Sequence, residues 1–226
     1  MNTKENLFRR EELTFFPLSS RESKSGLDII IEPDIKPELS PNLEKITMIA
    51  EKIIKAKNSG SSIVLTFGAH LIKNGLSLII RKLIEENYIT HLASNGAASI
   101  HDWEFAYQGK TEEDVRKYVN EGKFGMWEET GKYINLAIMA GAGNDIGYGE
   151  SICNMINQDK IEITEKILDS ALKKITEYGI KDREIIIRHS YKEYSFQEAI
   201  PKSNVEFTVH PHLGHDIIYT HPLNDM

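Results

Sequence analysis

Residues 62–104 read SIVLTFGAHLIKNGLSLIIRKLIEENYITHLASNGAASIHDWE, and this stretch predicts the fold. Its first six residues are mostly apolar and partly β-branched, which is typical of a buried strand, and a glycine follows them. Apolar residues then recur at helical spacing as far as about Asn87, and residues 88–93 form a second strand-like run that leads into another glycine turn. Two strands joined by one helix form a parallel pair through a right-handed crossover.

Strands and helices alternate along the rest of the chain as well. Further strands are predicted at residues 27–31, 184–187 and 205–209, and further helices at 41–57, 101–107, 127–140, 163–178 and 195–201, with one more opening at Thr111. The glycine-rich segment 141–150 follows no strand, so we interpret it as a helix break rather than a nucleotide-binding loop. This alternation predicts an α/β domain with a mainly parallel sheet, and such a sheet needs helices on both faces.

Capping residues mark three of the predicted helix starts. Ser40 is followed by Pro41, Thr111 is followed by three acidic residues, and Ser195 is followed three positions later by Glu198. A serine or threonine oxygen at the N-cap accepts a backbone N–H of the first turn, and proline is favoured at the first helical position. We therefore expect helices to open directly after these three residues.

The first 40 residues differ in character from the rest. Residues 1–26 are polar and of mixed charge, which predicts a loosely held arm. We accordingly divide the chain into an N-terminal arm, 1–40, and one α/β domain, 41–226.

Composition narrows the classes of function. The 226 residues are 40% hydrophobic and 27% charged, with a formal net charge of -7, so a nucleic-acid partner is not favoured. The one cysteine, Cys153, excludes an internal disulfide and favours a reducing compartment. The N-terminus has no apolar signal region, and no apolar run reaches the roughly 18–20 residues that cross a membrane. We expect a cytoplasmic protein without membrane contact.

The first candidate site is the turn TFGAHLIKNG (66–75). Gly68 and Ala69 follow a strand end, where a small residue lets the backbone approach a ligand. The helix after them offers free N–H groups to an anion or a polar cofactor, and His70 and Lys73 lie on its first turn. The alternative is an ordinary strand–helix turn with a solvated Lys73.

The second candidate is SNGAASIHDWE (94–104). Asn95, Gly96 and Ala97 leave space above a strand end, and His101, Asp102 and Glu104 then place an imidazole and two carboxylates within four residues. Such a cluster can bind an amine or relay protons. The alternative for Asp102 is a purely structural role near a helix start.

Two further segments are rich in ionisable residues. VHPHLGHDIIYTHP (209–222) holds four histidines (His210, His212, His215 and His221) and Asp216. A metal site would need about three converging ligands, and the spacing matches no standard zinc signature, so a polar pocket wall is the favoured interpretation. In FGMWEETG (124–131), Glu128 and Glu129 follow an aromatic pair and could contact a polyamine, or could simply begin a helix.

Taken together, these segments resemble the deoxyhypusine synthase family, and more closely its bacterial branch. GAHLIKNGL (68–76) is similar to the family's T-S-N-L-x-S-S-G-L turn, and NGAASIHDWE (95–104) to its A-G-G turn with acidic residues after it. LGHDII (213–218) is similar to an L-G-D-M-I segment. FGMWEETG and HDWEFAYQGKT look like segments of the bacterial branch, and the resemblance covers roughly residues 41–222.

The resemblance implies a Rossmann-like domain that binds NAD and assembles as a homotetramer. Members of the family oxidise spermidine with NAD and move its aminobutyl group, through a lysine imine, to a protein lysine or another amine. With the candidate segments above, it gives site residues in three groups. They are Gly68, Ala69, His70, Lys73, Asn95, Gly96 and Ala97 for the cofactor, His101, Asp102 and Asp216 for catalysis, and Glu104, Glu128 and His215 for the substrate.

Alternatives to this transferase remain open. Ala69 and Lys73 stand where the family has serines, and its catalytic W-G-K lysine has no counterpart before Met226. One alternative is a non-hypusinating, inactive or truncated member that binds a nucleotide or a polyamine. Another is a metal-dependent enzyme built on the four histidines.

Overall fold

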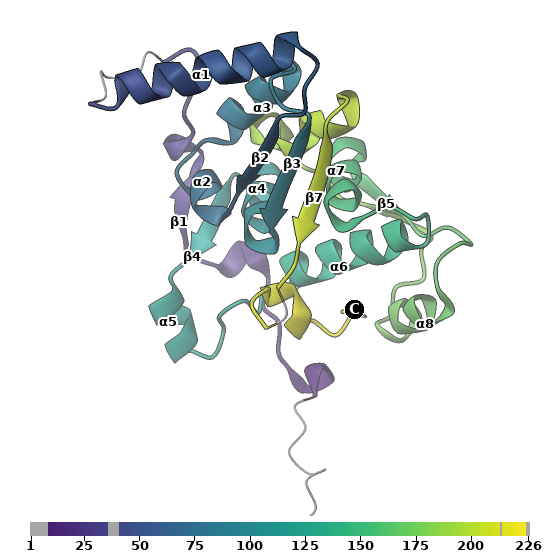
Figure 1. Cartoon of the computed structure of the whole chain (residues 1–226). Helices are drawn as coiled ribbons and strands as arrows, with labels where there is room; N and C mark the ends of the chain where they lie inside the picture. The colour runs from purple at the N-terminus through teal and green to yellow at the C-terminus, as the bar shows by residue number, and fades with distance from the viewer. Residues whose placement is uncertain (1–8, 36–40, 213, 225–226) are drawn as a thin grey trace, which may run out of the picture.

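The centre of the fold is a three-stranded parallel sheet in the order β2-β3-β7 (Figure 1). The computed structural model describes residues 9–35, 41–212 and 214–224. The strands are β2 (Val64–Phe67), β3 (His91–Asn95) and β7 (Glu206–His210). Thr66 lies opposite Ala93, which lies opposite Thr208, so the three strands end at one common edge.

Two small antiparallel pairs stand beside this sheet. β1 (Ser23–Gly26) pairs with β4 (Lys110–Glu113), and β5 (Lys160–Glu162) pairs with β6 (Glu184–Ile186). The first pair joins the N-terminal segment to the middle of the chain.

The helices between these strands are as follows. The α-helices are α1 (Leu43–Asn58), α2 (Ala69–Lys73), α3 (Ser77–Glu85), α4 (Gly96–Gln108), α5 (Val115–Asn120), α6 (Glu128–Ala142), α7 (Tyr148–Gln158) and α8 (Asp169–Glu177). The 3-10 helices are η1 (Arg10–Glu12), η2 (Leu18–Ser20), η3 (Leu27–Ile29), η4 (Lys192–Tyr194), η5 (Gln197–Lys202) and η6 (Ile217–Thr220).

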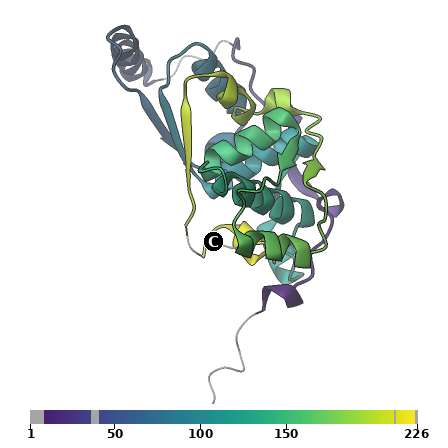
Figure 2. The ribbon, with the colours of Figure 1, turned by 90° about the vertical axis from the view of Figure 1, so that its right-hand side faces the viewer.

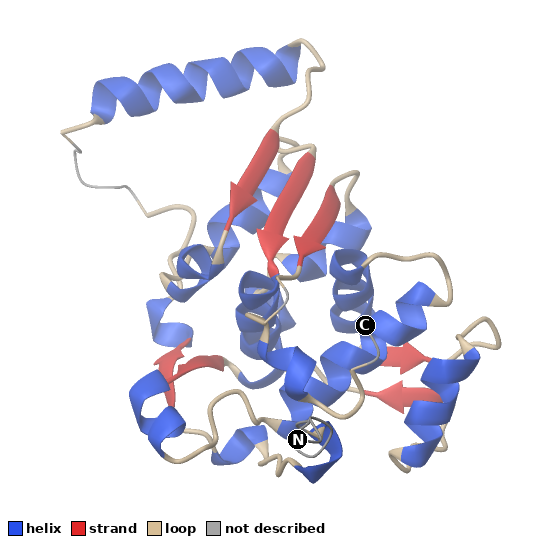
Figure 3. Cartoon of the chain, turned by 60° about the horizontal axis from the view of Figure 1, so that its bottom comes forward, coloured by secondary structure: helices blue, strands red, loops and turns tan. Residues whose placement is uncertain are grey.

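The predicted fold class is confirmed: the chain is a Rossmann-like α/β protein with a parallel sheet and helices on both sides. Figure 2 shows α1 at the upper left and the green and teal helices to the right of the sheet. One apolar core joins the sheet to α3, α4 and η5 through residues such as Leu92, Phe105 and Phe207. A second core, around Trp103 and Trp127, joins α4 to α6, α7 and α8, which Figure 3 draws below the sheet.

Several predicted elements are confirmed. The helix predicted at 41–57 is α1, although Ser40, its expected cap, lies outside the described residues. Ser195 Oγ accepts the Glu198 N–H at 3.4 Å, but the helix is of the 3-10 type, begins one residue later than predicted with Phe196 as its N-cap, and runs through Pro201. The expected break at 141–150 separates α6 from α7, and Cys153 is fully buried.

The helix predicted from residue 68 to 87 is instead two helices, α2 and α3. Gly75 lies between them at φ +80°, where a side chain would be strained. A Cβ there would also lie 1.9 Å from the Ile29 carbonyl oxygen, so only glycine allows η3 to pack this closely.

Two predictions in the N-terminal half are wrong because pairing with β4 overrides local preference. Residues 27–31 are not a strand: Leu27–Ile29 form η3, and the β1 strand that precedes them takes the pairing. Thr111 does not cap a helix but lies in β4, and α5 begins after Asp114, whose Oδ1 accepts the Lys117 N–H at 2.8 Å.

The helix predicted at 163–178 is also too long. Ile163 donates to the Arg183 carbonyl at 2.8 Å and so continues the β5–β6 pairing, which leaves only nine residues for α8. Gly179 follows α8 at φ +90°, the left-handed conformation in which glycine commonly ends a helix. β6 is an edge strand rather than a buried one, with Ile186 67% exposed.

The N-terminal segment is not a loose arm where it is described. Leu18 is 1% exposed and Arg21 7% exposed, and β1 pairs with β4. Residues 16–31 therefore pack as part of the domain rather than as a separate arm. No helix among the described residues has both the length and the hydrophobicity to cross a membrane.

Candidate functional site

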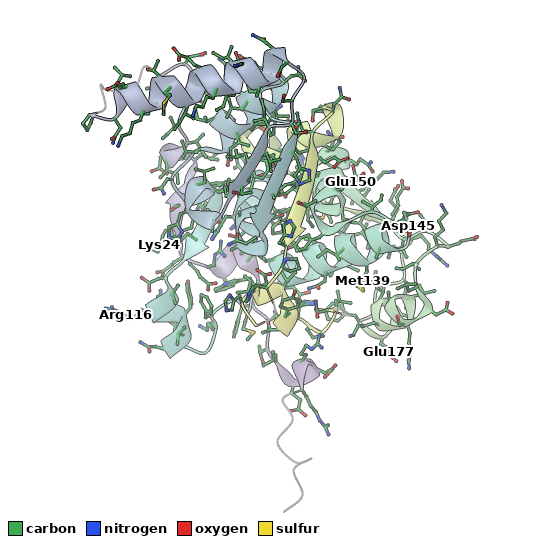
Figure 4. The ribbon with its side chains drawn as sticks, in the orientation of Figure 1. Lys24, Arg116, Met139, Asp145, Glu150 and Glu177 are labelled. Atoms are coloured by element: carbon green, nitrogen blue, oxygen red, sulfur yellow. The ribbon has the colours of Figure 1, made fainter. Side chains whose placement is uncertain are left out.

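A cavity of about 440 Å³ lies at the edge of the sheet where β3 and β7 end. It brings together six of the predicted site residues: Lys73, Ala97, His101, Glu104, His215 and Asp216. The other charged lining residues come from the N-terminal segment, β4 and α5: Arg21, Lys24, Glu112, Glu113, Asp114 and Arg116. Figure 4 labels Lys24 and Arg116 on the same side of the molecule.

Helix α4 aims two of these side chains at the cavity. Its N-cap is Asn95, whose side chain accepts the Ala98 N–H at 3.0 Å, and Gly109 ends it in the left-handed conformation. His101 and Glu104 are three residues apart on this helix and therefore share one face.

Glu104 is held by the most buried ion pair of the described chain. Both of its oxygens accept from the Arg21 guanidinium at 2.8 Å, and the two side chains are 1% and 2% exposed. The hydroxyls of Thr111 and Thr130 add bonds of 2.6 and 3.1 Å. Burial acts to raise the pKa of Glu104, but the charge of Arg21 and these bonds hold that pKa below its ordinary value.

The same network determines which nitrogen of His101 carries a proton. The Thr111 hydroxyl has one hydrogen and donates it to Glu104, so its oxygen can only accept at His101 Nδ1, 2.7 Å away. His101 Nδ1 is therefore the protonated nitrogen. Burial lowers the pKa of His101, so its neutral form predominates at pH 7 and Nε2 carries a lone pair.

On the neighbouring wall, Glu112 is neutralised. Its carboxylate lies 2.9 Å from Lys73 Nζ and 3.7 Å from Lys24 Nζ, and it accepts from Ser25 at 2.9 Å. Burial acts to raise the pKa of Glu112, but the bonds from Lys73 and Ser25 outweigh it and lower that pKa. The Lys73 of the predicted cofactor turn is thus already engaged by a carboxylate.

Glu113, the next residue of β4, has a structural role. It accepts the Trp127 Nε1–H at 2.9 Å and the Gly125 N–H at 3.1 Å. Burial raises its pKa against these bonds. The carboxylate positions the loop that leads into α6.

Asp216 lies against the beginning of α4. A Cβ on Gly96 would lie only 2.5 Å from Asp216 Oδ1, so glycine is what allows this approach. Asp216 Oδ2 accepts the His212 N–H at 3.1 Å, and we find no hydrogen-bond partner for Oδ1 among the described residues. Burial raises the pKa of Asp216.

The beginning of α4 does not fit the diphosphate of a dinucleotide. Asn95 already accepts the Ala98 N–H, and the Asp216 carboxylate lies where the phosphates would approach. A phosphate anion there would meet a carboxylate rather than free N–H groups. The residues predicted for NAD at this turn, Asn95, Gly96 and Ala97, are therefore not arranged to hold its diphosphate.

The other predicted cofactor turn contributes little to the cavity. A Cβ on Gly68 would lie 3.5 Å from Asn95 Nδ2, so the two turns are neighbours as the parallel pair requires. Gly68, Ala69 and His70 do not line the cavity, and only Lys73 reaches it.

Asp102 does not share the site with His101. Adjacent helical residues point about 100° apart, so Asp102 faces the core on the other side of α4. Its carboxylate accepts from three side chains and two backbone N–H groups, supplied by Ser77, Ser195, Phe196 and Gln197. This prediction of a catalytic role is corrected to a structural one, in which Asp102 anchors the start of η5.

Glu128 is also absent from the cavity. Its carboxylate accepts from the Tyr178 hydroxyl at 2.8 Å and lies 3.6 Å from His221 Nε2. The cluster ties α6 to α8 and to the C-terminal segment. The substrate role predicted for Glu128 has no geometric support at this cavity.

The four histidines predicted as one group are dispersed. His210 bonds Thr208, His221 is buried beside Glu128, and only His212 and His215 lie together, with ring centroids 4.3 Å apart. Across the described residues no three histidine, cysteine, aspartate or glutamate side chains converge to hold a metal ion. Among the described residues, the four histidines therefore do not form one metal site.

Sequence reasoning missed Arg21, Thr111 and Arg116. Arg21 lies in the segment predicted to be a loose arm. It is 83 residues from the carboxylate with which it pairs, so no local pattern predicts this ion pair. Thr111 has the sequence pattern of a helix cap, which hides its place in the site. One signal in the sequence distinguishes the cavity residues from Asp102: His101 and Glu104 are spaced so that they share a helix face, and Asp102 is not on that face.

Comparison with known proteins identifies no family. No family model matches the chain, and no curated protein matches it either. Among solved structures, it is similar to ArgZ, an arginine dihydrolase from the ornithine–ammonia cycle in cyanobacteria, with 18% identity and a TM-score of 0.42 over 80% of this chain and 20% of that one. It is also similar to AgrE in a ternary complex with ornithine and NAD+, with 18% identity and a TM-score of 0.40 over 81% of this chain and 21% of that one. The chain thus spans about a fifth of these proteins, and likenesses at these TM-scores carry no argument about its function.

Proposed function

We propose that the cavity binds a polyamine or another small primary amine, and that His101 accepts a proton from it. The observation that carries this proposal is the ordered series from His101 to Thr111, Glu104 and Arg21. It leaves Nε2 unprotonated on a side chain that lines the cavity. We find no hydrogen-bond partner for this nitrogen among the described residues.

Charge in the cavity supports a cationic ligand. Glu104 and Glu112 are neutralised by Arg21, Lys73 and Lys24, whereas Asp216 has an oxygen that is free to accept. An ammonium group can donate to Asp216 Oδ1, and a second amine of the same ligand can donate to His101 Nε2. A volume of about 440 Å³ is within the usual range for small-molecule sites.

The proton transfer balances within this network. An ammonium N–H proton of the ligand moves to His101 Nε2, and the nitrogen keeps the electron pair of the broken N–H bond as a neutral amine. His101 then carries a positive charge that remains bonded through Nδ1 to Thr111, which donates to Glu104. Glu104 is already ionised, so it stabilises the imidazolium without taking the proton.

The test is titration of the protein with spermidine in a calorimeter. We expect binding, and Asp216→Asn should weaken it about tenfold or more because it removes a charged acceptor. Asp145→Asn is the matched control, since Asp145 is exposed and Figure 4 labels it on the opposite side of the molecule from Lys24 and Arg116. Equal weakening in both variants, or no heat with the unsubstituted protein, contradicts the proposal.

The affinity for spermidine should fall on acidification. His101 is protonated below a pKa that burial places under its ordinary value of 6.5, and the resulting cation repels an ammonium group. We therefore expect full affinity at pH 7 and above and a loss with a midpoint below pH 6.5. Calorimetry across this range checks the prediction. His101→Gln, which keeps a neutral acceptor, should lose the part of this pH dependence that comes from His101; what remains reports Asp216, whose pKa burial raises.

A second candidate is the NAD-dependent transferase that the sequence resemblance implies, with a protein lysine or another amine as acceptor. The observation that favours it is that the turns after β2 and β3 lie side by side, with Gly68 next to Asn95. The carboxylate of Asp216 at the beginning of α4 opposes it. If this candidate holds, NAD should raise the melting temperature of the protein, and adding spermidine should then reduce the bound NAD to NADH. Spermidine binding without either effect would support amine binding but not the transferase.

A further inference from the structure

The guanidinium of Arg116 lines the cavity without a partner of its own. Arg116 is the second residue of α5, and it is exposed. We find neither a hydrogen bond nor an ion pair of this guanidinium among the described residues. The other arginine of the cavity differs, because Arg21 is buried and both of its terminal nitrogens donate to Glu104. Arg116 is therefore the arginine of this cavity that a ligand can contact.

A second cation is only weakly engaged at the same wall. The carboxylate of Glu112 serves two ammonium groups, that of Lys73 at 2.9 Å and that of Lys24 at 3.7 Å. The longer distance belongs to Lys24, whose side chain is 53% exposed. Asp114, which also lines the cavity, caps α5, where its Oδ1 accepts a backbone N–H at 2.8 Å. Lys24 and Arg116 are thus the cations of this wall that an anion can reach.

The acceptors that an amine can use lie on a different wall. Asp216 precedes η6 and lies against Gly96, the first residue of α4. His101 lies five residues further along α4, which corresponds to about 7–8 Å along the helix axis. Figure 1 shows α5 to the left of the yellow segment that follows β7. Groups that can hold a cation and groups that can hold an anion therefore occupy different parts of one cavity.

Large apolar side chains also line the cavity. They are Ile100, Val115, Phe124 and Ile217. Val115 is 56% exposed and Phe124 is 37% exposed, although both belong to the cavity wall. A Cβ on Gly125 would lie 2.8 Å from Ile217 Cγ2, so the loop that carries Phe124 packs directly on Ile217. Methylene groups of a ligand would cover this surface and remove it from water, which is favourable.

We infer that the cavity selects an amine that carries a carboxylate at its other end, and that Arg116 is the residue that determines this preference. The inference rests on the proposed function, in which Asp216 and His101 hold the amine. The planar guanidinium of Arg116 can donate two N–H groups to one carboxylate, a geometry for which arginine is well suited. A second ammonium group at the same place would be repelled, so a polyamine binds more weakly than an ω-amino carboxylate.

Calorimetric titration of the full chain at pH 7.5 with three matched ligands tests the inference. Hexylamine, 6-aminohexanoate and 1,6-diaminohexane have the same chain length and differ only in the group at the far end. We expect 6-aminohexanoate to bind about tenfold more tightly than hexylamine, and 1,6-diaminohexane to bind no more tightly than hexylamine. The corresponding four- and five-carbon ligands extend the comparison to shorter spans.

Two substitutions assign the preference to Arg116. Arg116→Ala should bring the affinities of 6-aminohexanoate and hexylamine to a ratio of about one, and Arg116→Glu should make 1,6-diaminohexane the tightest of the three ligands. Both variants should fold, because Arg116 is exposed. Arg188→Glu is the matched control, since Arg188 is exposed, does not line the cavity and undergoes the same change of charge.

The outcomes separate this inference from the proposed function. Equal affinity for the alkylamine and the amino carboxylate at every chain length overturns the inference but leaves amine binding in place. A preference that survives Arg116→Ala, or that Arg188→Glu removes equally, does the same. If neither hexylamine nor spermidine binds, the proposed function fails and the inference fails with it.

Discussion

Arg21→Met should lower the free energy of unfolding by about 3–5 kcal/mol, because it leaves the Glu104 charge buried without a partner. The two side chains are 2% and 1% exposed, so water cannot replace the guanidinium. Arg9→Met is the matched control: Arg9 pairs with Glu12 at the surface, where a pair contributes about 0–1 kcal/mol. Urea unfolding followed by tryptophan fluorescence measures both.

Acidification should reduce the difference between Arg21→Met and the unsubstituted protein. In the intact pair the pKa of Glu104 lies below its ordinary value, so its stabilisation is present above the unfolded-state pKa of about 4.3 and is lost as pH falls through the lower folded value. In the variant, burial without Arg21 raises that pKa, and protonation relieves the unpaired charge. A difference that does not change with pH would mean that lost packing, rather than charge, causes the destabilisation.

Asp102→Ala should be similarly severe, at about 3–5 kcal/mol. Its carboxylate is completely buried and satisfies five donors, and each buried donor left unsatisfied costs about 1–3 kcal/mol, partly offset where the site relaxes. Asp182→Ala is the control, since Asp182 is exposed and such substitutions usually change stability by less than about 0.5 kcal/mol.

Ligand binding by an Asp102 variant separates a structural role from a role in the cavity. Asp102→Asn keeps an acceptor and should remain folded at low temperature. Because Asp102 does not line the cavity, the folded variant should bind spermidine as tightly as the unsubstituted protein. A large loss of affinity with an unchanged fold would return Asp102 to the site.

The α/β class and the edge that carries the cavity could be predicted from the sequence. The run 62–104 contains its own parallel strand pair, and the strands β2 and β3 lie within four residues of where their patterns place them. The prediction of an element is wrong where pairing with a distant segment outweighs the local conformational preference. Thr111 has the preferences of a helix cap but pairs with Ser25 across β1 and β4.

The site could be predicted only in part, for a related reason. His101, Glu104 and Asp216 lie near glycine turns at strand ends, which is a local pattern. Whether each side chain faces the cavity depends on which face of its helix it occupies and on which distant residues form bonds with it. Asp102 bonds to Ser195 just before η5, and Glu128 bonds to Tyr178 just after α8. No spacing in the sequence predicts these partners.

The sequence by itself thus determined the parallel strand pair and the sheet edge at which the cavity lies, because both arise from short-range periodicity. Only the tertiary structure decided that Arg21 pairs with Glu104, that Thr111 orders the proton of His101, and that Asp216 occupies the start of α4. These contacts join residues from 7 to 120 positions apart, as from Thr111 to Glu104 and from Gly96 to Asp216. Their energies depend on burial, which exists only once the chain has packed.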